Sequence, residues 1–280
     1  MFTERLNKII RDKKSLLCIG LDTEIERIPA MLLSELDPLF SFNKSIIEAT
    51  KDYAAAFKLN IAFYESLGFP GWELLEKTLS IMPSDVLVIA DAKRADIGNT
   101  SKKYAETYFK TYNFDAITVS PFMGLDSVMP FLDFADRGIF ILCLTSNSGS
   151  QDFQFLKVED EPLYLKIARK VVEWNFINGN CGLVVGGTHT TEIKSIRDVA
   201  AGLPFLVPGI GAQGGNLELA VRYATDERGL STLINSSRTI VYASAEYDFA
   251  DVAAERAKHL RDHINMVVRV HKNPDSLDQN

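Results

Sequence analysis

The sequence is poor in cysteine, and the few thiols that it has do not suggest a disulfide framework. Its three cysteines, Cys18, Cys143 and Cys181, are an odd number, and each lies in or beside a short apolar run. Thiols in such runs usually pack as small hydrophobic side chains. We therefore expect the cysteines to lie in the core of the protein rather than to crosslink it.

An excess of positive charge and long apolar runs are also lacking. The chain has 30 lysines and arginines against 37 aspartates and glutamates, whereas proteins that bind nucleic acid or anionic membranes present a basic face. No stretch approaches the roughly 18 apolar residues of a membrane-spanning helix, and the N-terminus lacks the apolar segment of a signal peptide. These absences predict a cytoplasmic protein that binds neither nucleic acid nor a membrane.

The composition is that of a globular chain. Apolar residues make up 46% and charged residues 24% of the 280 residues, which is a typical balance for a folded protein. Barrels of about 250 residues routinely form one domain. We therefore predict a single domain over residues 1–271 and a disordered tail over residues 272–280.

Short apolar runs alternate along the chain with segments of helical spacing. The runs are continuous in their hydrophobicity, as expected for parallel strands that are covered on both faces. Candidate strands lie near residues 16–22, 55–60, 86–92, 116–120, 138–145, 181–187, 205–210 and 231–237. Candidate helices lie at residues 31–53, 71–81, 98–112, 124–136, 162–177, 190–201, 215–226 and 249–268. Eight such units predict an α/β protein with the (β/α)8 TIM-barrel fold.

Local signals mark some of the boundaries between these elements. Asp96, Asn99 and Thr100 are expected to open the helix after the third strand, and Thr190 is expected to open a later one. The longest irregular stretch is predicted at residues 146–161, after the fifth strand. Loops of that length are often functional.

Charged residues follow the third predicted strand in a spacing that favours catalysis. The active site of such a barrel lies at the C-terminal ends of its strands. Period-two alternation directs Asp91 and Lys93 to the same side, and Asp96 follows at the start of the next helix. Together with Lys58 from the preceding strand end, these residues can hold a lysine ammonium as a positioned proton donor. A surface ion-pair network is the alternative, which the strand-end location disfavours.

A second group of residues, after the seventh and eighth predicted strands, favours phosphate binding. Residues 207–215 have the sequence VPGIGAQGG, and residues 236–238 have the sequence SSR. Glycines let backbone N–H groups approach an anion, and arginine offers a bidentate fork. Alternatively, these glycines could serve only as turn residues. The presence of Arg238 at the end of the adjacent strand makes that interpretation less favoured. The predicted site contains Pro208, Gln213, Gly214, Ser237 and Arg238, and residues 211–215 are the candidate lid.

Two histidines could contribute to a metal site. His259 and His263 stand four residues apart on the last predicted helix, a spacing that allows both to bind one ion. No third ligand is evident in the sequence, and an exposed helix face is the favoured interpretation. We predict no metal site.

One segment of the sequence resembles the signature of a known family. Residues 91–100, DAKRADIGNT, resemble the D-x-K-x-x-D-I-x-x-T signature of the orotidine 5'-phosphate decarboxylase family. Segments 57–60, 62–65, 145–147, 207–215 and 235–238 extend the resemblance toward the longer bacterial-type subfamily, over about residues 16–245. The resemblance implies a carboxy-lyase of UMP biosynthesis that converts orotidine 5'-phosphate to uridine 5'-phosphate and carbon dioxide without any cofactor.

The same resemblance implies a role for each matching residue. The implied roles are a catalytic tetrad of Lys58, Asp91, Lys93 and Asp96, ribose binding by Asp22, pyrimidine contact by Ser146, and phosphate binding by Gln213 and Arg238. Lys93 is implied to protonate C6 of the pyrimidine, and the register of the segment 146–148 against the ring stays open. Asp96, Ile97 and Thr100 are implied to enter the active site of a second subunit, which predicts a homodimer with shared sites.

Two other functions are compatible with a phosphate-binding barrel. Sugar-phosphate decarboxylases and aldolase-like relatives share the D-x-K-x-x-D core but use magnesium held by carboxylates. They place a glutamate where Lys58 stands here, and a lysine would repel the metal. A catalytically silent phosphometabolite sensor would have lost the tetrad, whereas all four residues are present. Metal-free decarboxylation is therefore the favoured prediction.

Overall fold

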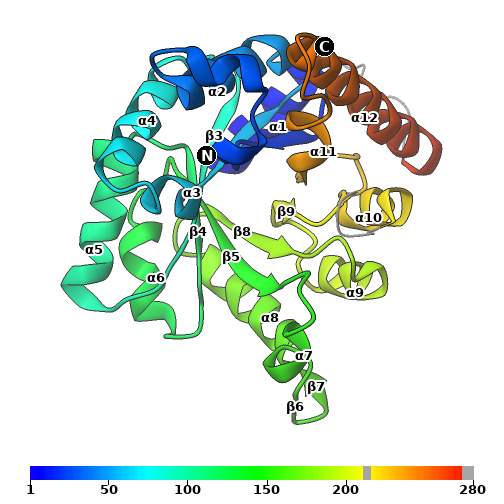
Figure 1. The fold of residues 1–280 in the computed structure, drawn as a ribbon. Coiled ribbons are helices and arrows are strands. Elements are labelled where there is room, and N and C mark those ends of the chain that lie inside the picture. Colours follow the sequence, from blue (N-terminus) through cyan, green and yellow to red (C-terminus); the bar gives the residue numbers. More distant parts are fainter. Residues whose placement is uncertain (211–215, 273–280) are drawn as a thin grey trace.

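The computed structural model describes residues 1–210 and 216–272, which contain eight parallel strands that close into a barrel (Figure 1). The strands are β1 (Leu17–Gly20), β2 (Ala56–Asn60), β3 (Leu87–Arg94), β4 (Ala116–Val119), β5 (Gly138–Leu144), β8 (Cys181–Val185), β9 (Phe205–Val207) and β10 (Thr232–Ser236). Around the barrel they follow the order β1-β10-β9-β8-β5-β4-β3-β2. Each lies at a predicted apolar run, and the predicted (β/α)8 fold is confirmed.

Helices form a ring outside the strands (Figure 1). The longer helices are α2 (Pro38–Thr50), α4 (Phe69–Ser80), α5 (Gly98–Glu106), α6 (Leu125–Leu132), α8 (Leu163–Asn175), α9 (Thr190–Val199), α10 (Leu217–Ala224) and α12 (Phe249–His271). Short helices at the strand ends and in the loops are α3 (Ile61–Glu65), α7 (Ser150–Phe153) and α11 (Arg238–Val241), with the 3-10 turns η1 (Ile25–Arg27) and η2 (Ala30–Ser34). A π-helical turn, η3 (Thr107–Thr111), extends α5.

Three predicted segments differ from the structure. The helix predicted at residues 31–53 is interrupted, because α2 begins only at Pro38. Proline favours the first helical turn and disfavours helical geometry in the residue before it. The stretch 146–161, predicted to be irregular, instead contains α7 and a hairpin of β6 (Lys157–Val158) and β7 (Glu161–Pro162), which projects from the barrel (Figure 1). Helix α5 begins at Gly98, where the predicted helix 98–112 starts, but its N-cap is Ile97 rather than Asp96, whose carboxylate accepts a hydrogen bond from the Ile97 backbone N–H.

Helix α1 (Phe2–Lys13) closes the N-terminal end of the barrel. Phe2 makes an edge-to-face contact with Phe140, at 6.0 Å between ring centroids, and a Cβ atom at Gly138 would clash with its ring. Leu6 and Ile10 of the same helix are fully buried. Helix α1 thus fills the barrel interior at this end, and the cavity that contains the predicted site residues lies at the opposite end, where the strands finish.

The burial of the cysteines and the apolarity of the helices bear on the expectations from composition. All three cysteines are buried and free, as the apolar runs around them predicted. Among the residues that the structure describes, no helix has both the length and the apolarity needed to cross a bilayer. Residues 273–280 of the predicted tail lie outside the described part of the chain.

Candidate active site

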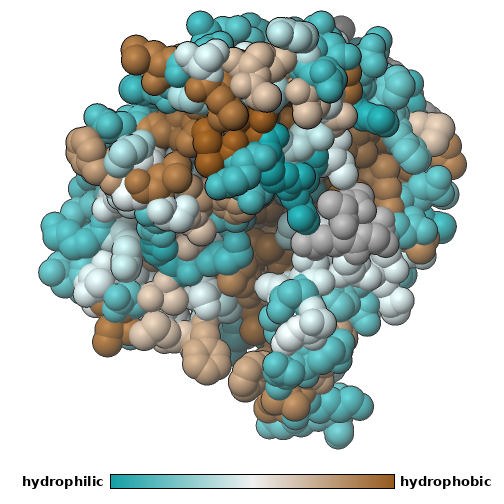
Figure 2. Space-filling model, viewed as in Figure 1, coloured by the Kyte–Doolittle hydropathy of each residue, from teal (hydrophilic) through white to brown (hydrophobic). Residues whose placement is uncertain are grey.

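A cavity of about 400 Å³ lies at the C-terminal ends of the barrel strands. Figure 2 shows a depression near the centre of this face, with hydrophilic residues beside it and hydrophobic residues at its base. The predicted site residues that line the cavity are Asp22, Lys58, Asp91, Lys93, Ser146, Pro208, Ser237 and Arg238. Pockets of this size commonly bind small molecules.

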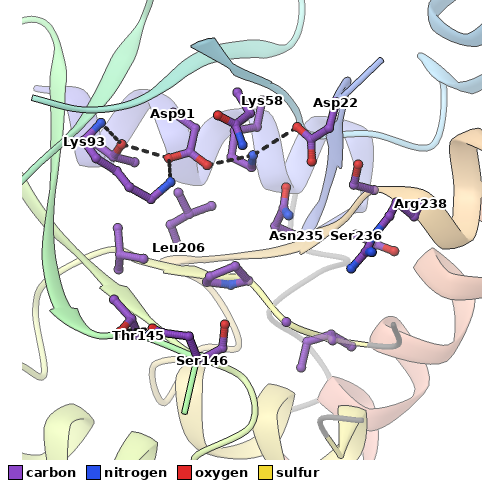
Figure 3. Close-up of a pocket in the computed structure, with 18 of the residues that line it drawn as sticks. Asp22, Lys58, Asp91, Lys93, Thr145, Ser146, Leu206, Asn235, Ser236 and Arg238 are labelled. Atoms are coloured by element: carbon purple, nitrogen blue, oxygen red, sulfur yellow. Dashed lines mark hydrogen bonds and ion pairs between the residues drawn. The ribbon is translucent and has the colours of Figure 1, made fainter. Parts of the chain in front are cut away.

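Charged side chains form a row of alternating sign along one side of the cavity. Lys93 Nζ lies 2.6 Å from Asp91 Oδ1, and Lys58 Nζ lies 3.0 Å from Asp91 Oδ2. Lys58 Nζ also lies 3.7 Å from Asp22 Oδ1, which continues the row to β1 (Figure 3). Three strand ends therefore bring together the convergent lysines and aspartates that the sequence indicated.

Burial strengthens the coupling between these charges. Burial opposes the charge on Lys58, but the carboxylates of Asp91 and Asp22 outweigh it and raise the pKa of Lys58 above its ordinary value. Burial also opposes the charge on Asp91, and there Lys58 and Lys93 lower the pKa of the carboxyl well below its ordinary value. Lys58 and Asp91 are therefore both ionised near neutral pH, which fixes a buried ion pair beside Lys93.

The backbone of β3 departs from regular strand geometry where it carries these charges. Lys93 has a φ of 48°, a conformation that residues other than glycine rarely adopt. The pairing of β3 with β4 shifts register between Ala90 and Arg94, so the strand bulges there. Asp91 and Lys93 face the same cavity, as predicted, but a bulge rather than simple alternation brings them there. Such a conformation costs about 1–3 kcal/mol and is typical of functional sites.

The fourth member of the predicted tetrad does not join the row within one chain. Among the described residues, neither Asp96 nor its neighbours Ile97 and Thr100 line the cavity. Asp96 Oδ1 accepts a hydrogen bond from the Ile97 N–H at 2.8 Å, and Ile97 is 52% exposed. The cavity of a single chain thus contains Lys58, Asp91 and Lys93 without Asp96.

The predicted phosphate residues lie at the other end of the cavity. Figure 3 shows Lys93 and Arg238 at opposite ends of the view, with Ser146 across the cavity from the charged row. Ser237 Oγ donates a hydrogen bond to the Gly20 carbonyl at 2.9 Å, which joins the ends of β10 and β1. Pro208 lines the cavity after β9. Gln213, Gly214 and the candidate lid at 211–215 lie outside the described residues.

Polar residues that were not predicted from the sequence also line the cavity from within the strands. Thr118 of β4 and Asn235 of β10 are both buried and both face the cavity. Each is a polar residue near the end of an otherwise apolar run, and that signal could have identified them. Ser120, just after β4, is not among the described lining residues, and its N–H donates to the Arg94 carbonyl.

The two histidines of α12 lie away from the charged row. His263 Nε2 is 3.6 Å from Glu218 Oε1 on α10. Within the described part of the chain, no group of three or more histidines, cysteines, aspartates and glutamates is placed to hold a metal ion. The absence of a metal site stays a prediction.

Fold and cavity together define the class of this protein. It is a (β/α)8 barrel with a lysine–aspartate row at the mouth and an arginine at the far end of the cavity, an arrangement that suits a small anionic substrate. Residues 15–249 match the model of the Orotidine 5'-phosphate decarboxylase / HUMPS family. The chain therefore belongs to this family, which confirms the resemblance of the DAKRADIGNT segment.

Relatives match over nearly their whole length. The orotidine 5'-phosphate decarboxylase of Christiangramia forsetii is 47% identical over 93% of this chain and 96% of its own. That of Dehalococcoides mccartyi is 46% identical over 94% of this chain and 97% of its own. Among solved structures, the OMP decarboxylase of Leishmania donovani has a TM-score of 0.84 and 39% identity, covering 95% of this chain and 98% of that one.

Proposed function

We propose that this protein decarboxylates orotidine 5'-phosphate, giving uridine 5'-phosphate and carbon dioxide in UMP biosynthesis. The observation that carries the proposal is the row of Lys93, Asp91 and Lys58 at the mouth of the barrel. The family model alone also covers HUMPS proteins, and the relatives at 46–47% identity bear the decarboxylase name. The proposal therefore rests on both the site and the family.

The chemistry follows from an ammonium held beside the reacting carbon. The bond between C6 and the carboxylate breaks, its electron pair stays on C6, and carbon dioxide leaves. The Lys93 ammonium stabilises the charge on C6 and then transfers a proton to it, forming the C6–H bond of the product. Lys93 regains its proton from water, so no cofactor enters the scheme. Asp91, 2.6 Å away, orients the ammonium.

The remaining lining residues suit the other parts of the substrate. Asp22 Oδ1 is buried and has no hydrogen-bond partner among the described residues, so a ribose hydroxyl could donate to it. Ser146 lies across the cavity, where it can contact the pyrimidine (Figure 3). Arg238, Ser237 and Pro208 line the far end of the cavity, where Arg238 is proposed to bind the phosphate. Gln213 and Gly214 of the candidate lid are proposed to join it, and Pro208 to contact the substrate.

A magnesium-dependent relative is the main alternative, and the position of Lys58 disfavours it. The Lys58 ammonium lies between Asp22 and Asp91, the two carboxylates that a divalent ion would need as ligands. It would repel a divalent ion bound there. The silent-sensor alternative is disfavoured because the row beside Lys93 is intact.

We further propose that the protein is a homodimer with shared active sites. Asp96 and Ile97 precede α5 and Thr100 lies in its first turn, and none of the three lines the cavity of their own chain. Ile97 exposes half of its surface, which is available for burial against a second subunit. A second copy could therefore supply the Asp96 carboxylate that the row lacks. The cytoplasmic location expected from the sequence stays a prediction.

Loss of orotidine 5'-phosphate absorbance on incubation with the purified protein tests the proposed function. Wild type is expected to turn over equally with and without EDTA, and Lys93→Ala to lose at least about 100-fold in kcat, because it removes the general acid. Lys194→Ala, which removes an exposed lysine paired with Asp198 on α9, is the control and should match wild type. Turnover that EDTA abolishes would favour the magnesium alternative, and binding without turnover would favour a sensor.

A further inference from the structure

The hydroxyl of Thr118 connects the two residues on which the proposed chemistry depends. Thr118 is 1% exposed and lies in β4, next to the bulged end of β3. Its Oγ1 accepts a hydrogen bond from the Lys93 backbone N–H at 2.9 Å and donates one to Asp91 Oδ1 at 3.0 Å. Lys93 Nζ donates to the same carboxylate oxygen at 2.6 Å. Backbone, hydroxyl, carboxylate and ammonium therefore form a closed ring.

The bulge explains why a hydroxyl is needed at this position. On β3 the paired residues Ala90 and Arg94 are four apart, whereas their partners Ile117 and Val119 on β4 are two apart. The register shift takes the Lys93 N–H out of the regular ladder, and leaving this part-buried N–H without a partner would be costly. The Thr118 side chain replaces the missing ladder acceptor. The Thr118 hydroxyl also donates a hydrogen bond to Asp91. An apolar side chain of the same shape, such as valine, could not do so.

The ring also fixes an unfavourable backbone conformation. Lys93 holds its φ of 48° while its side chain turns back to Asp91. Non-glycine residues keep such a conformation only when surrounding contacts enforce it. The hydrogen bond from the Lys93 N–H to Thr118 helps to enforce this conformation, because it is made by the backbone of the strained residue itself.

We propose that Thr118 is a positioning residue that sets the place of the Lys93 ammonium through the Lys93 backbone and the Asp91 carboxylate. This inference rests on the proposed decarboxylase function. Because Thr118 acts through the proton donor, its loss should slow the chemical step more than it weakens substrate binding. Small displacements of a catalytic group have large effects on rate, on the order of 100-fold for 1 Å.

The test compares Thr118→Val, which keeps the shape and removes the hydroxyl, with Thr118→Ser, which keeps the hydroxyl. The valine variant is expected to lose about 10- to 100-fold in kcat with KM within about threefold of wild type, and the serine variant to recover most of the loss. Thr50→Val is the matched control, because Thr50 is a buried threonine whose hydroxyl, among the described residues, donates to the Ile46 carbonyl of its own helix. Thr118→Ala takes the place of the valine variant if that variant does not fold.

The inference is overturned if Thr118→Val keeps wild-type kcat, or if it changes only KM. It is also overturned if the serine variant is as slow as the valine variant. An inactive wild type would instead refute the proposed function, and hydrogen exchange at the Lys93 amide would then decide the inference. Faster exchange in Thr118→Val than in Thr118→Ser supports the ring, whereas equal protection in wild type and both variants contradicts it.

Discussion

At the scale of single residues, the stability of this protein is coupled to the ionisation of one carboxyl group. Asp91 is in contact with two ammonium groups, of Lys58 and Lys93, and these hold its pKa in the folded protein well below its ordinary value. In the unfolded chain an aspartate titrates near about 3.9. The stabilisation from Asp91 is therefore fully present above that value and is lost as the pH falls below it toward the lowered folded pKa.

We predict that Asp91→Asn lowers the free energy of unfolding near neutral pH by about 3 kcal/mol, because the buried Lys58 charge loses the nearer of its two carboxylate partners. Between about pH 5 and pH 3, the stability of the variant should also fall less steeply than that of wild type. Chemical denaturation across this pH range measures both effects. Asp12→Asn is the control, because Asp12 pairs with Lys8 on the exposed face of α1, where removal should cost less than about 1 kcal/mol. Equal slopes in wild type and Asp91→Asn would contradict the prediction.

At the scale of elements, the barrel separates a stabilising end from a functional end. Helix α1 fills the N-terminal end, and Phe2 packs there against Phe140 of β5. The charged row occupies the opposite ends of β1, β2 and β3. Because the two ends lie apart in the barrel, we expect that the packing of one can change without moving the side chains of the other.

We predict that Phe2→Ala lowers the free energy of unfolding by about 3–4 kcal/mol, because it leaves a cavity beneath β5. Phe176→Ala, which removes a side chain that is 87% exposed, should change stability by less than about 0.5 kcal/mol. Denaturant unfolding measures the difference between the two variants. Both should keep wild-type kcat at temperatures where they are folded, and a large loss of kcat in folded Phe2→Ala would argue against the separation of the two ends.

At the scale of the whole molecule, the proposed homodimer would complete the site. One chain brings together Lys58, Asp91 and Lys93, while Asp96 lies outside its own cavity. A homodimer that exchanges this segment would place one chain's Asp96 beside the other chain's Lys93. Its symmetry would make the two sites equivalent.

We predict that a heterodimer of one Lys93→Ala subunit and one Asp96→Ala subunit has about half of the wild-type activity. One of its two sites then carries both substitutions and the other carries none. Co-expression with two affinity tags isolates this species. A heterodimer of Lys93→Ala and Asp91→Asn is the control and should be inactive, because both residues belong to the same chain's cavity. An inactive first heterodimer would refute shared sites.

The sequence by itself determined the barrel and most of the charged row. Continuous apolar runs specify buried parallel strands because neither face of such a strand meets water. Polar residues at the ends of those runs, such as Lys58, Asp91 and Arg238, were found because parallel strands end on one face of the barrel. The start of α2 at Pro38 was also encoded locally, although helical periodicity alone placed that start too early.

Only the tertiary structure decided how those residues meet. The bulge in β3, the φ of Lys93 and the ring through Thr118 depend on the register between two strands, which the spacing within either strand does not contain. The hairpin of β6 and β7 was missed because two-residue strands have too little periodicity to detect. Asp96 is near Lys93 in sequence but does not line its cavity, because the chain has by then left β3 and runs toward α5. Local pattern thus specified the strands and their ends, and cross-strand packing fixed the distances between their side chains.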